Sequence, residues 1–211
     1  MMASPLIIWL HGLGDSGAGW SHLKSELGLN GVRYIFPDAP VAPVSCNGGM
    51  RMTSWMDLQD IPVTTSNVDD IAGLEASTKV VHEIIDREVA NGTPSTSIVL
   101  GGFSQGSAMA ILAGYSYSKP LAGIVGFSGW AARKGEWGSI VAQGANAQTP
   151  AFVAHGEYDN VVEPDCGVEV NELLAKHGVD SVSYSTYAMA HSAHPQQFAA
   201  LRAWLKDVLK L

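Results

Sequence analysis

The sequence has few cysteines and few charged residues. Only two cysteines, Cys46 and Cys166, occur in 211 residues, so the chain lacks the disulfide framework that supports small secreted domains. Lys, Arg, Asp and Glu make up 15% of the residues, and the formal net charge is −8. An acidic chain disfavours binding to nucleic-acid phosphates, and it also disfavours a polybasic attachment to anionic lipid.

Long hydrophobic runs are also missing. The segment from Met1 to Pro5 has no basic residue, and the apolar run Leu6–Leu10 is too short for the core of a signal peptide. No run approaches the roughly 20 apolar residues of a membrane-spanning helix. Met2 stands where N-myristoylation would need glycine. We therefore expect a cytoplasmic protein with free thiols and no integral membrane segment.

The order of the expected elements predicts an α/β fold in a single domain, residues 1–211. Hydrophobic residues make up 46% of the chain, which is enough for one sizeable core. Strand and helix signals alternate. Strands are expected at 5–10, 32–36, 96–102, 121–127, 151–154 and 181–187, and helices at 67–89, from 104 to about 117, at 164–177 and from 194 or 195 onward. A long polar loop is expected at 37–66. This alternation is typical of a mainly parallel sheet with helices on both faces, whose functional site lies at the carboxyl ends of the strands.

The most informative motif is Gly102-Phe-Ser-Gln-Gly106, a G-x-S-x-G pentapeptide. The apolar run Ile98–Leu100 precedes it, and a helix-forming run, Ser107–Ala113, follows it. A strand that turns sharply into a helix with serine at the apex is a nucleophile elbow. Glycine on both sides of the serine permits the strained turn and the close approach of strand and helix. Ser104 is therefore the candidate nucleophile, and the alternative is a glycine-rich turn with an incidental serine.

A second serine motif, Gly14-Asp-Ser16-Gly17, resembles the active-site sequence of chymotrypsin-like proteases. Those enzymes carry His, then Asp, then Ser along the chain. Only His11 precedes Ser16 among the histidines, and the chain alternates strands with helices. We therefore reject Ser16 as the nucleophile.

A serine nucleophile needs a base, and the base needs an orienting acid. On this kind of sheet the chain order is Ser, then Asp or Glu, then His. Asp159, in a tight turn after an expected strand, is the preferred acid, and Glu157 is the second choice. His191 and His194 both follow the last expected strand and are both candidates for the base.

Other polar residues have simpler interpretations. His155 ends an expected strand, but only Glu136 and surface positions precede it as acids, so we do not choose it as the base. His177 falls in the last turn of an expected helix and Asp165 in the first turn of one, where each charge favours the helix dipole. His191 and His194 could suggest a metal pair, but no third ligand is evident.

Stabilising the oxyanion of acyl transfer requires two backbone N–H groups. One comes from the residue after the nucleophile, here Gln105, and the other from a loop after an early strand. That loop is His11-Gly-Leu-Gly-Asp15, in which Leu13 would supply the N–H group.

Seven segments in order carry a resemblance to a known family. They are His11-Gly-Leu-Gly-Asp15 with Trp20, Phe36–Val44, Ser54–Leu58, Gly101–Gly106, Phe127-Ser-Gly-Trp130, His155-Gly-x-x-Asp159 and Met189–Ser192. With them, the chain resembles the acyl-protein thioesterase and small carboxylesterase, or lysophospholipase-like, family of α/β hydrolases. The resemblance implies an α/β-hydrolase fold, compact and without a separate lid domain.

The same resemblance implies the roles of five residues. Ser104 would be the nucleophile, Asp159 the acid and His191 the base, with Leu13 and Gln105 as oxyanion donors. It implies hydrolysis of acyl esters or thioesters, including S-acylated proteins and lysophospholipids, with neither cofactor nor metal. The rival hypothesis is a hydrolase-like binding protein without turnover. A homodimer remains open.

Substrate contacts are expected from aromatic and methionine side chains in the loops. Trp55 and Trp130 follow strands and could contact substrate or fill the core. Met50 and Met52 could form an adaptable apolar surface for an acyl chain. The glycines beside them, Gly48 and Gly49, leave the preferred chain length open.

Overall fold

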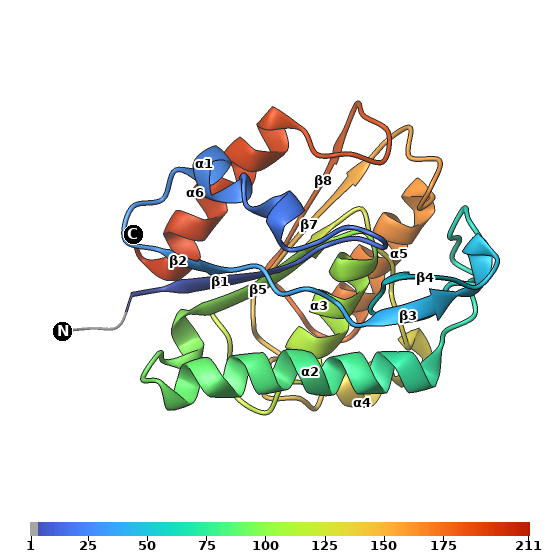
Figure 1. Ribbon diagram of the computed structural model, residues 1–211. Coiled ribbons are helices and arrows are strands. Elements are labelled where there is room, and N and C mark those ends of the chain that lie inside the picture. Colours follow the sequence, from blue (N-terminus) through green and yellow to red (C-terminus); the bar gives the residue numbers. More distant parts are fainter. Residues whose placement is uncertain (1–3) are drawn as a thin grey trace.

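The computed structural model describes residues 4–211, and a parallel sheet forms its centre (Figure 1). The six strands of this sheet are β1 (Leu6–Leu10), β2 (Arg33–Ile35), β5 (Ile98–Phe103), β6 (Gly123–Phe127), β7 (Ala151–Gly156) and β8 (Val182–Tyr187). They lie in the order β2-β1-β5-β6-β7-β8, with every neighbouring pair parallel. The predicted strands and the parallel sheet are confirmed.

Helices cover both faces of the sheet. One face carries α1 (Leu23–Leu27) and α6 (Pro195–Leu209), and the other carries α2 (Ile71–Ala90), α3 (Gln105–Ser116), α4 (Trp137–Ile140) and α5 (Pro164–Lys176) (Figure 1). Short 3-10 turns occur at Ala18–Trp20, Ser45–Asn47, Ser95–Ser97 and Lys134–Glu136. Along β1, Ile8 packs in the core on the α3 side while Ile7 and Trp9 pack under α6. Because side chains alternate between faces and both faces are covered, the whole strand is apolar.

The predicted long loop at 37–66 is wrong over part of its length, because it contains a β-hairpin. Strand β3 (Val41–Val44) pairs antiparallel with β4 (Met50–Thr53). Gly48 and Gly49 both have positive φ, at 64° and 79°, and so reverse the chain between the strands. The glycines that suggested an irregular loop are therefore the turn of a hairpin.

Two helix assignments also change. Helix α2 begins at Ile71, not at Asn67, because the Asp70 carboxylate accepts a hydrogen bond from Gly73 N at 3.0 Å and caps the helix. The stretch between residues 127 and 151, where we expected no helix, contains α4, where Trp137 is fully buried. Burial of one tryptophan fixes a short helix that the local sequence does not signal.

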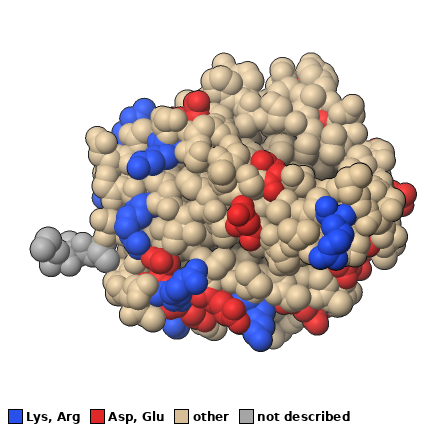
Figure 2. Space-filling model, in the orientation of Figure 1, with Lys and Arg blue, Asp and Glu red and all other residues tan. Residues whose placement is uncertain are grey.

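The carboxyl ends of the strands meet at one edge of the sheet, and the β3–β4 hairpin lies beyond that edge (Figure 1). Uncharged side chains cover most of the face drawn in Figure 2, as a charged content of 15% leads one to expect. Cys46 and Cys166 form no disulfide. Across residues 4–211, every helix is too short or too polar to cross a membrane.

Candidate active site

Ser104 lies at the apex of a sharp turn between β5 and α3. Its φ and ψ of 56° and −122° are unusual for a residue with a side chain. Its N–H group donates to Phe127 O at 2.8 Å, which ties the turn to β6. A Cβ atom on Gly106 would lie 2.2 Å from Leu10 O, and one on Gly102 would lie 2.2 Å from Gly106 O. Only glycine fits at these two positions, which explains the pentapeptide.

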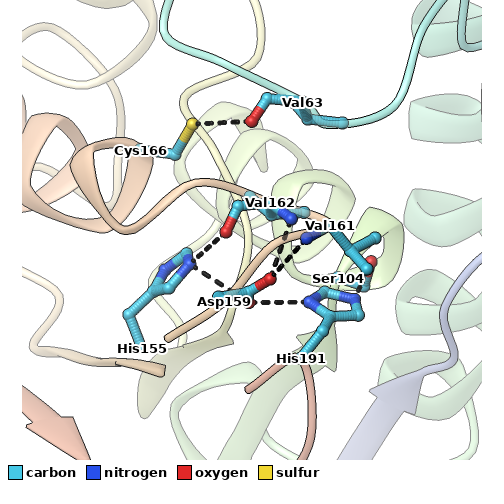
Figure 3. Close-up of polar contacts among 8 residues, drawn as sticks. All are labelled: Val63, Ser104, His155, Asp159, Val161, Val162, Cys166 and His191. Carbon is cyan, nitrogen blue, oxygen red and sulfur yellow. Dashed lines mark hydrogen bonds and ion pairs between the residues drawn. The ribbon is translucent and has the colours of Figure 1, made fainter. Parts of the chain in front are cut away.

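Three residues that follow three different strands meet at this turn (Figure 3). His191, after β8, places its Nε2 atom 2.9 Å from Ser104 Oγ. The other ring nitrogen, Nδ1, lies 2.7 Å from Oδ2 of Asp159, which follows β7. The structure thus brings together the serine, the preferred acid and one of the two candidate bases.

Asp159 is buried, with its side chain 0% exposed. Its Oδ1 atom accepts hydrogen bonds from Val161 N and Val162 N, each at 2.9 Å. Burial raises the pKa of this carboxyl, but hydrogen bonds from His155, His191 and the two backbone amides outweigh it and hold the pKa below its ordinary value. Asp159 is therefore anionic at neutral pH.

The competing candidates lie elsewhere. Glu157 Oε1 accepts from Thr186 Oγ1 at 2.9 Å on the exposed side of the turn. His194 caps α6, where its Nδ1 atom accepts from Gln196 N at 3.2 Å. His177 ends α5 and Asp165 lies in its first turn, as predicted. None of these side chains contacts Ser104.

The two amides expected to stabilise an oxyanion belong to Leu13 and Gln105. A Cβ atom on Gly12 would lie 3.3 Å from Ser104 Cβ, so the loop at 11–13 runs directly against the serine. Within residues 4–211, the Leu13 and Gln105 amides have no backbone or side-chain acceptor. Both N–H groups therefore remain available for a ligand oxygen beside Ser104.

The side chain of Gln105 has a second role that the sequence did not indicate. Its Oε1 atom accepts from Trp55 N at 2.7 Å, and its Nε2 atom donates to Met56 O at 2.7 Å. These bonds fasten the segment after β4 to the start of α3. The sequence held no signal for these bonds, because it does not show that the Gln105 amide is buried and therefore requires partners.

Trp55 contacts the loop that carries Leu13 and does not line the cavity beside Ser104. The side chain is 1% exposed, and Nε1 donates to His11 O at 2.9 Å. His11 in turn accepts from Ala39 N at Nε2, at 3.0 Å, and donates from Nδ1 to Gly12 O at 2.7 Å. The expected substrate contact of Trp55 is replaced by a structural one, in which the indole fixes the loop that carries Leu13.

A cavity of about 300 Å³ opens beside Ser104. Its walls are mainly apolar and include Leu13, Met52, Leu58, Ile61, Val63, Phe103, Trp130, Val161 and Val162. Trp130 and Met52 therefore line the cavity beside Ser104, and their contact with substrate stays a prediction. Met50 does not line the cavity, because it points into solvent from the hairpin and is 64% exposed.

A larger hollow of about 500 Å³ lies between the hairpin and the start of α2. It is lined by residues such as Pro40, Trp55 and Asp70, and it does not reach Ser104. A choice by volume alone would take this hollow as the active site, but Ser104 and His191 line the smaller cavity. No group of three or more His, Cys, Asp or Glu in the described chain is placed to hold a metal ion.

The arrangement of the sheet and of Ser104 defines the class of the protein. A parallel sheet with helices on both faces, and a serine on a strand–helix elbow followed by Asp and then His, is the plan of the α/β hydrolases. The chain belongs to the phospholipase/carboxylesterase family, whose sequence pattern it matches over residues 2–209. The resemblance drawn from the sequence motifs is confirmed.

Individual relatives agree with this assignment. Acyl-protein thioesterase 1 of Yarrowia lipolytica is 39% identical over 215 residues, covering 97% of this chain and 92% of the relative. Acyl-protein thioesterase 1 of Gibberella zeae is 37% identical, covering 96% and 90%. The crystal structure of Arabidopsis thaliana SOBER1 superposes with a TM-score of 0.90 at 32% identity, covering 97% of this chain and 99% of that one. For acyl-protein thioesterase 2 of Zea mays the TM-score is 0.87 at 29% identity, with coverages of 99% and 95%. The protein is a serine hydrolase of carboxylic esters and thioesters.

Proposed function

We propose that the protein removes acyl groups from S-acylated cysteines of proteins, with Ser104 as nucleophile, His191 as base and Asp159 as orienting acid. The observation that carries the proposal is the continuous hydrogen-bonded path from Ser104 Oγ through His191 to Asp159, with distances of 2.9 and 2.7 Å. The names of the thioesterase relatives support the choice of substrate. Lysophospholipids are the alternative substrates, since they present the same acyl part on a different leaving group.

In the first half of the reaction, Ser104 Oγ attacks the carbonyl carbon of the thioester and passes its proton to His191 Nε2. The carbonyl oxygen becomes an oxyanion, which the Leu13 and Gln105 amides stabilise. Asp159 stabilises the imidazolium that forms. The carbon–sulfur bond then breaks, and the cysteine leaves as a thiol after taking the proton from His191.

In the second half, water replaces the thiol beside His191. His191 takes a proton from the water, and the resulting hydroxide attacks the acyl carbon of the ester on Ser104. The bond to Ser104 Oγ breaks, and Oγ recovers a proton from His191. The products are a carboxylic acid and the starting enzyme.

Substitution of Ser104 tests the proposal directly. Ser104→Ala should lower kcat by several orders of magnitude, on the order of 10⁴- to 10⁶-fold, while the protein stays folded. Ser107→Ala is the matched control, because the Ser107 hydroxyl is buried without a partner in the described chain and should not affect turnover. A slowly hydrolysed acyl substrate should leave an acyl adduct on Ser104 of the wild type, visible by intact mass, and His191→Ala should form none, because His191 is the base for acylation as well. Full activity in Ser104→Ala would refute the mechanism.

The rival hypothesis of a binding protein without turnover makes a different prediction. A fluorophosphonate probe should label the wild-type chain and Ser107→Ala but leave Ser104→Ala unlabelled. Absence of labelling in the wild type, together with saturable binding of an acyl ligand, would favour the binding protein. Sedimentation velocity on the same samples would test the homodimer.

The cavity beside Ser104 bears on the acyl chain. Its walls are apolar, and each buried CH₂ group contributes about 0.8 kcal/mol, so four added methylenes could raise kcat/KM by about two orders of magnitude. We therefore expect kcat/KM to rise from acetyl towards medium-chain substrates in a panel of p-nitrophenyl esters from acetate to palmitate. One palmitoyl thioester in the panel tests acceptance of thioesters. Rates that decline steadily beyond acetyl would contradict an acyl-binding role for the cavity.

A further inference from the structure

His155 is a second buried histidine beside the acid of the site. It is the penultimate residue of β7 and is 0% exposed. Its Nε2 atom lies 2.9 Å from Val162 O and 3.4 Å from Asp159 Oδ2 (Figure 3). His155 does not line the cavity beside Ser104, so the chemical steps above do not use it.

The contacts determine where the proton of His155 lies. Both neighbours of Nε2 are oxygen acceptors, so Nε2 must carry the hydrogen and share it between them. The other nitrogen, Nδ1, is buried and has no partner in the described chain. A proton on Nδ1 would leave a buried N–H group without an acceptor, which is costly. Nε2 is therefore the ring nitrogen that donates a hydrogen bond towards Asp159.

Helix α5 holds this ring in place. A Cβ atom on Gly167 would lie 2.6 Å from His155 Nδ1 and 2.9 Å from Cγ. The backbone of α5 thus packs directly on one side of the ring, while Nε2 points at the turn that holds Asp159. The imidazole cannot retreat from Asp159 without moving the helix.

We propose that His155 is a positioning residue, whose Nε2–H group holds Asp159 Oδ2 in line with His191 Nδ1. The proposal rests on the proposed function, because it assigns a partner to the acid of that mechanism. The Val161 and Val162 amides fix Oδ1 alone, and within residues 4–211 the side chains that reach Oδ2 are those of His191 and His155. His155 therefore limits rotation of the carboxylate about its Cβ–Cγ bond.

His155→Met tests this role, because methionine keeps an apolar side chain of similar reach and removes the N–H donor. We expect kcat to fall about 10- to 100-fold with KM changed less than about twofold, as for other residues that orient a catalytic group. His155→Gln places an amide N–H group near the position of Nε2 and should recover most of kcat. The low-field proton resonance of the His191–Asp159 hydrogen bond should be lost or broadened in His155→Met and retained in His155→Gln.

Gly167→Ala provides a second test that keeps the donor. The added Cβ pushes the ring from the α5 side and should lower kcat without raising KM. Gly138→Ala is its control, since the nearest atom to the new Cβ is 3.8 Å away. A folded His155→Met with wild-type kcat would overturn the proposal, and so would equal losses in the Met and Gln variants. If His155→Met does not fold, an unchanged kcat in Gly167→Ala overturns it.

The two proposals fail in distinguishable ways. If Ser104→Ala is inactive while His155→Met is fully active, the mechanism stands and His155 has no positioning role. If Ser104→Ala retains activity, the mechanism itself is wrong. Circular dichroism and thermal unfolding of each variant show whether the protein is folded before kinetics are compared.

Discussion

Asp159 is a buried carboxylate surrounded by N–H donors and not by Lys or Arg. Backbone amides hold one oxygen and two imidazoles approach the other. These hydrogen bonds outweigh burial and lower the pKa of the carboxyl. An anion stabilised in this way costs the folded protein little at neutral pH and supplies the fixed negative charge beside His191.

The lowered pKa of Asp159 makes a linkage prediction. Its stabilising contribution is present above the unfolded value, about 3.9, and is lost as pH falls toward the lower folded value. The free energy of unfolding of the wild type, relative to Asp159→Asn, should therefore decrease by roughly 1–3 kcal/mol between pH 5 and pH 2. Urea unfolding at several pH values measures it. Asp207→Asn is the control, since that side chain is 84% exposed. A pH-independent difference would contradict the assignment.

The two histidines after β8 should behave differently. His191→Ala should abolish turnover, because Nε2 is the atom next to Ser104 Oγ. His194→Ala should keep most activity and lose some stability, because it caps α6. Since the base must be neutral to accept a proton from Ser104, kcat/KM of the wild type should fall at acidic pH. The reverse ranking of the two variants would show that the loop at 188–194 reaches the serine with the other histidine.

At the scale of elements, the β5–α3 junction depends on two glycines. Gly106→Ala would place a Cβ 2.2 Å from Leu10 O and 2.5 Å from His11 O, which are rigid backbone atoms of the neighbouring strand and oxyanion loop. We expect a loss of about 1–3 kcal/mol of stability or more, and a larger loss of activity, because the loop carrying Leu13 must move. Gly135→Ala, whose new Cβ would meet nothing within 4 Å, should change neither. Unfolding midpoints and kcat/KM of the pair provide the test.

Elements that are buried on both faces were predictable from the sequence, and elements fixed by distant partners were not. Strand β1 is apolar along its whole length because both faces are covered, so its run of five residues signals it. The β3–β4 hairpin is only half-buried and has a proline in β3, so its sequence resembles a loop. The start of α2 is set by the Asp70 cap, whereas Asn67, three residues earlier, also has the side chain of a cap.

The same distinction holds at the site. Ser104 and Asp159 follow strand ends in the order expected of this fold, so motif and order predict them. The same order leaves His191 and His194 as candidates for the base, and the family resemblance favours His191. The roles of His155, Trp55 and the Gln105 side chain depend on what lies across the interior from each. A sequence does not display such contacts. We did not choose His155 because no suitable acid precedes it, whereas its partner in the structure, Asp159, lies four residues after it.

Across the whole molecule, one core region lies between the sheet and helices α2 to α5, and a second lies between the sheet and helices α1 and α6. The two regions share the strands of a single sheet. Ile8 belongs to one region and Ile7 to the other, so neither region can unfold while the other keeps its sheet. Residues 4–211 should therefore unfold as one cooperative domain. Urea curves followed by far-UV circular dichroism and by tryptophan fluorescence should coincide, because Trp9 reports one region and Trp137 the other. Two separate midpoints would contradict a single domain.

The strained backbone of Ser104 lowers the stability of the folded protein at the position that catalysis requires. A φ of 56° with a ψ of −122° belongs to a region that glycine enters freely and that costs other residues about 1–3 kcal/mol. Ser104→Gly should release that strain and raise the urea midpoint, whereas Ser104→Ala, which keeps a Cβ, should not. Selection for thermal robustness alone would thus favour loss of the serine. The most durable form of this hydrolase is expected to be an inactive one.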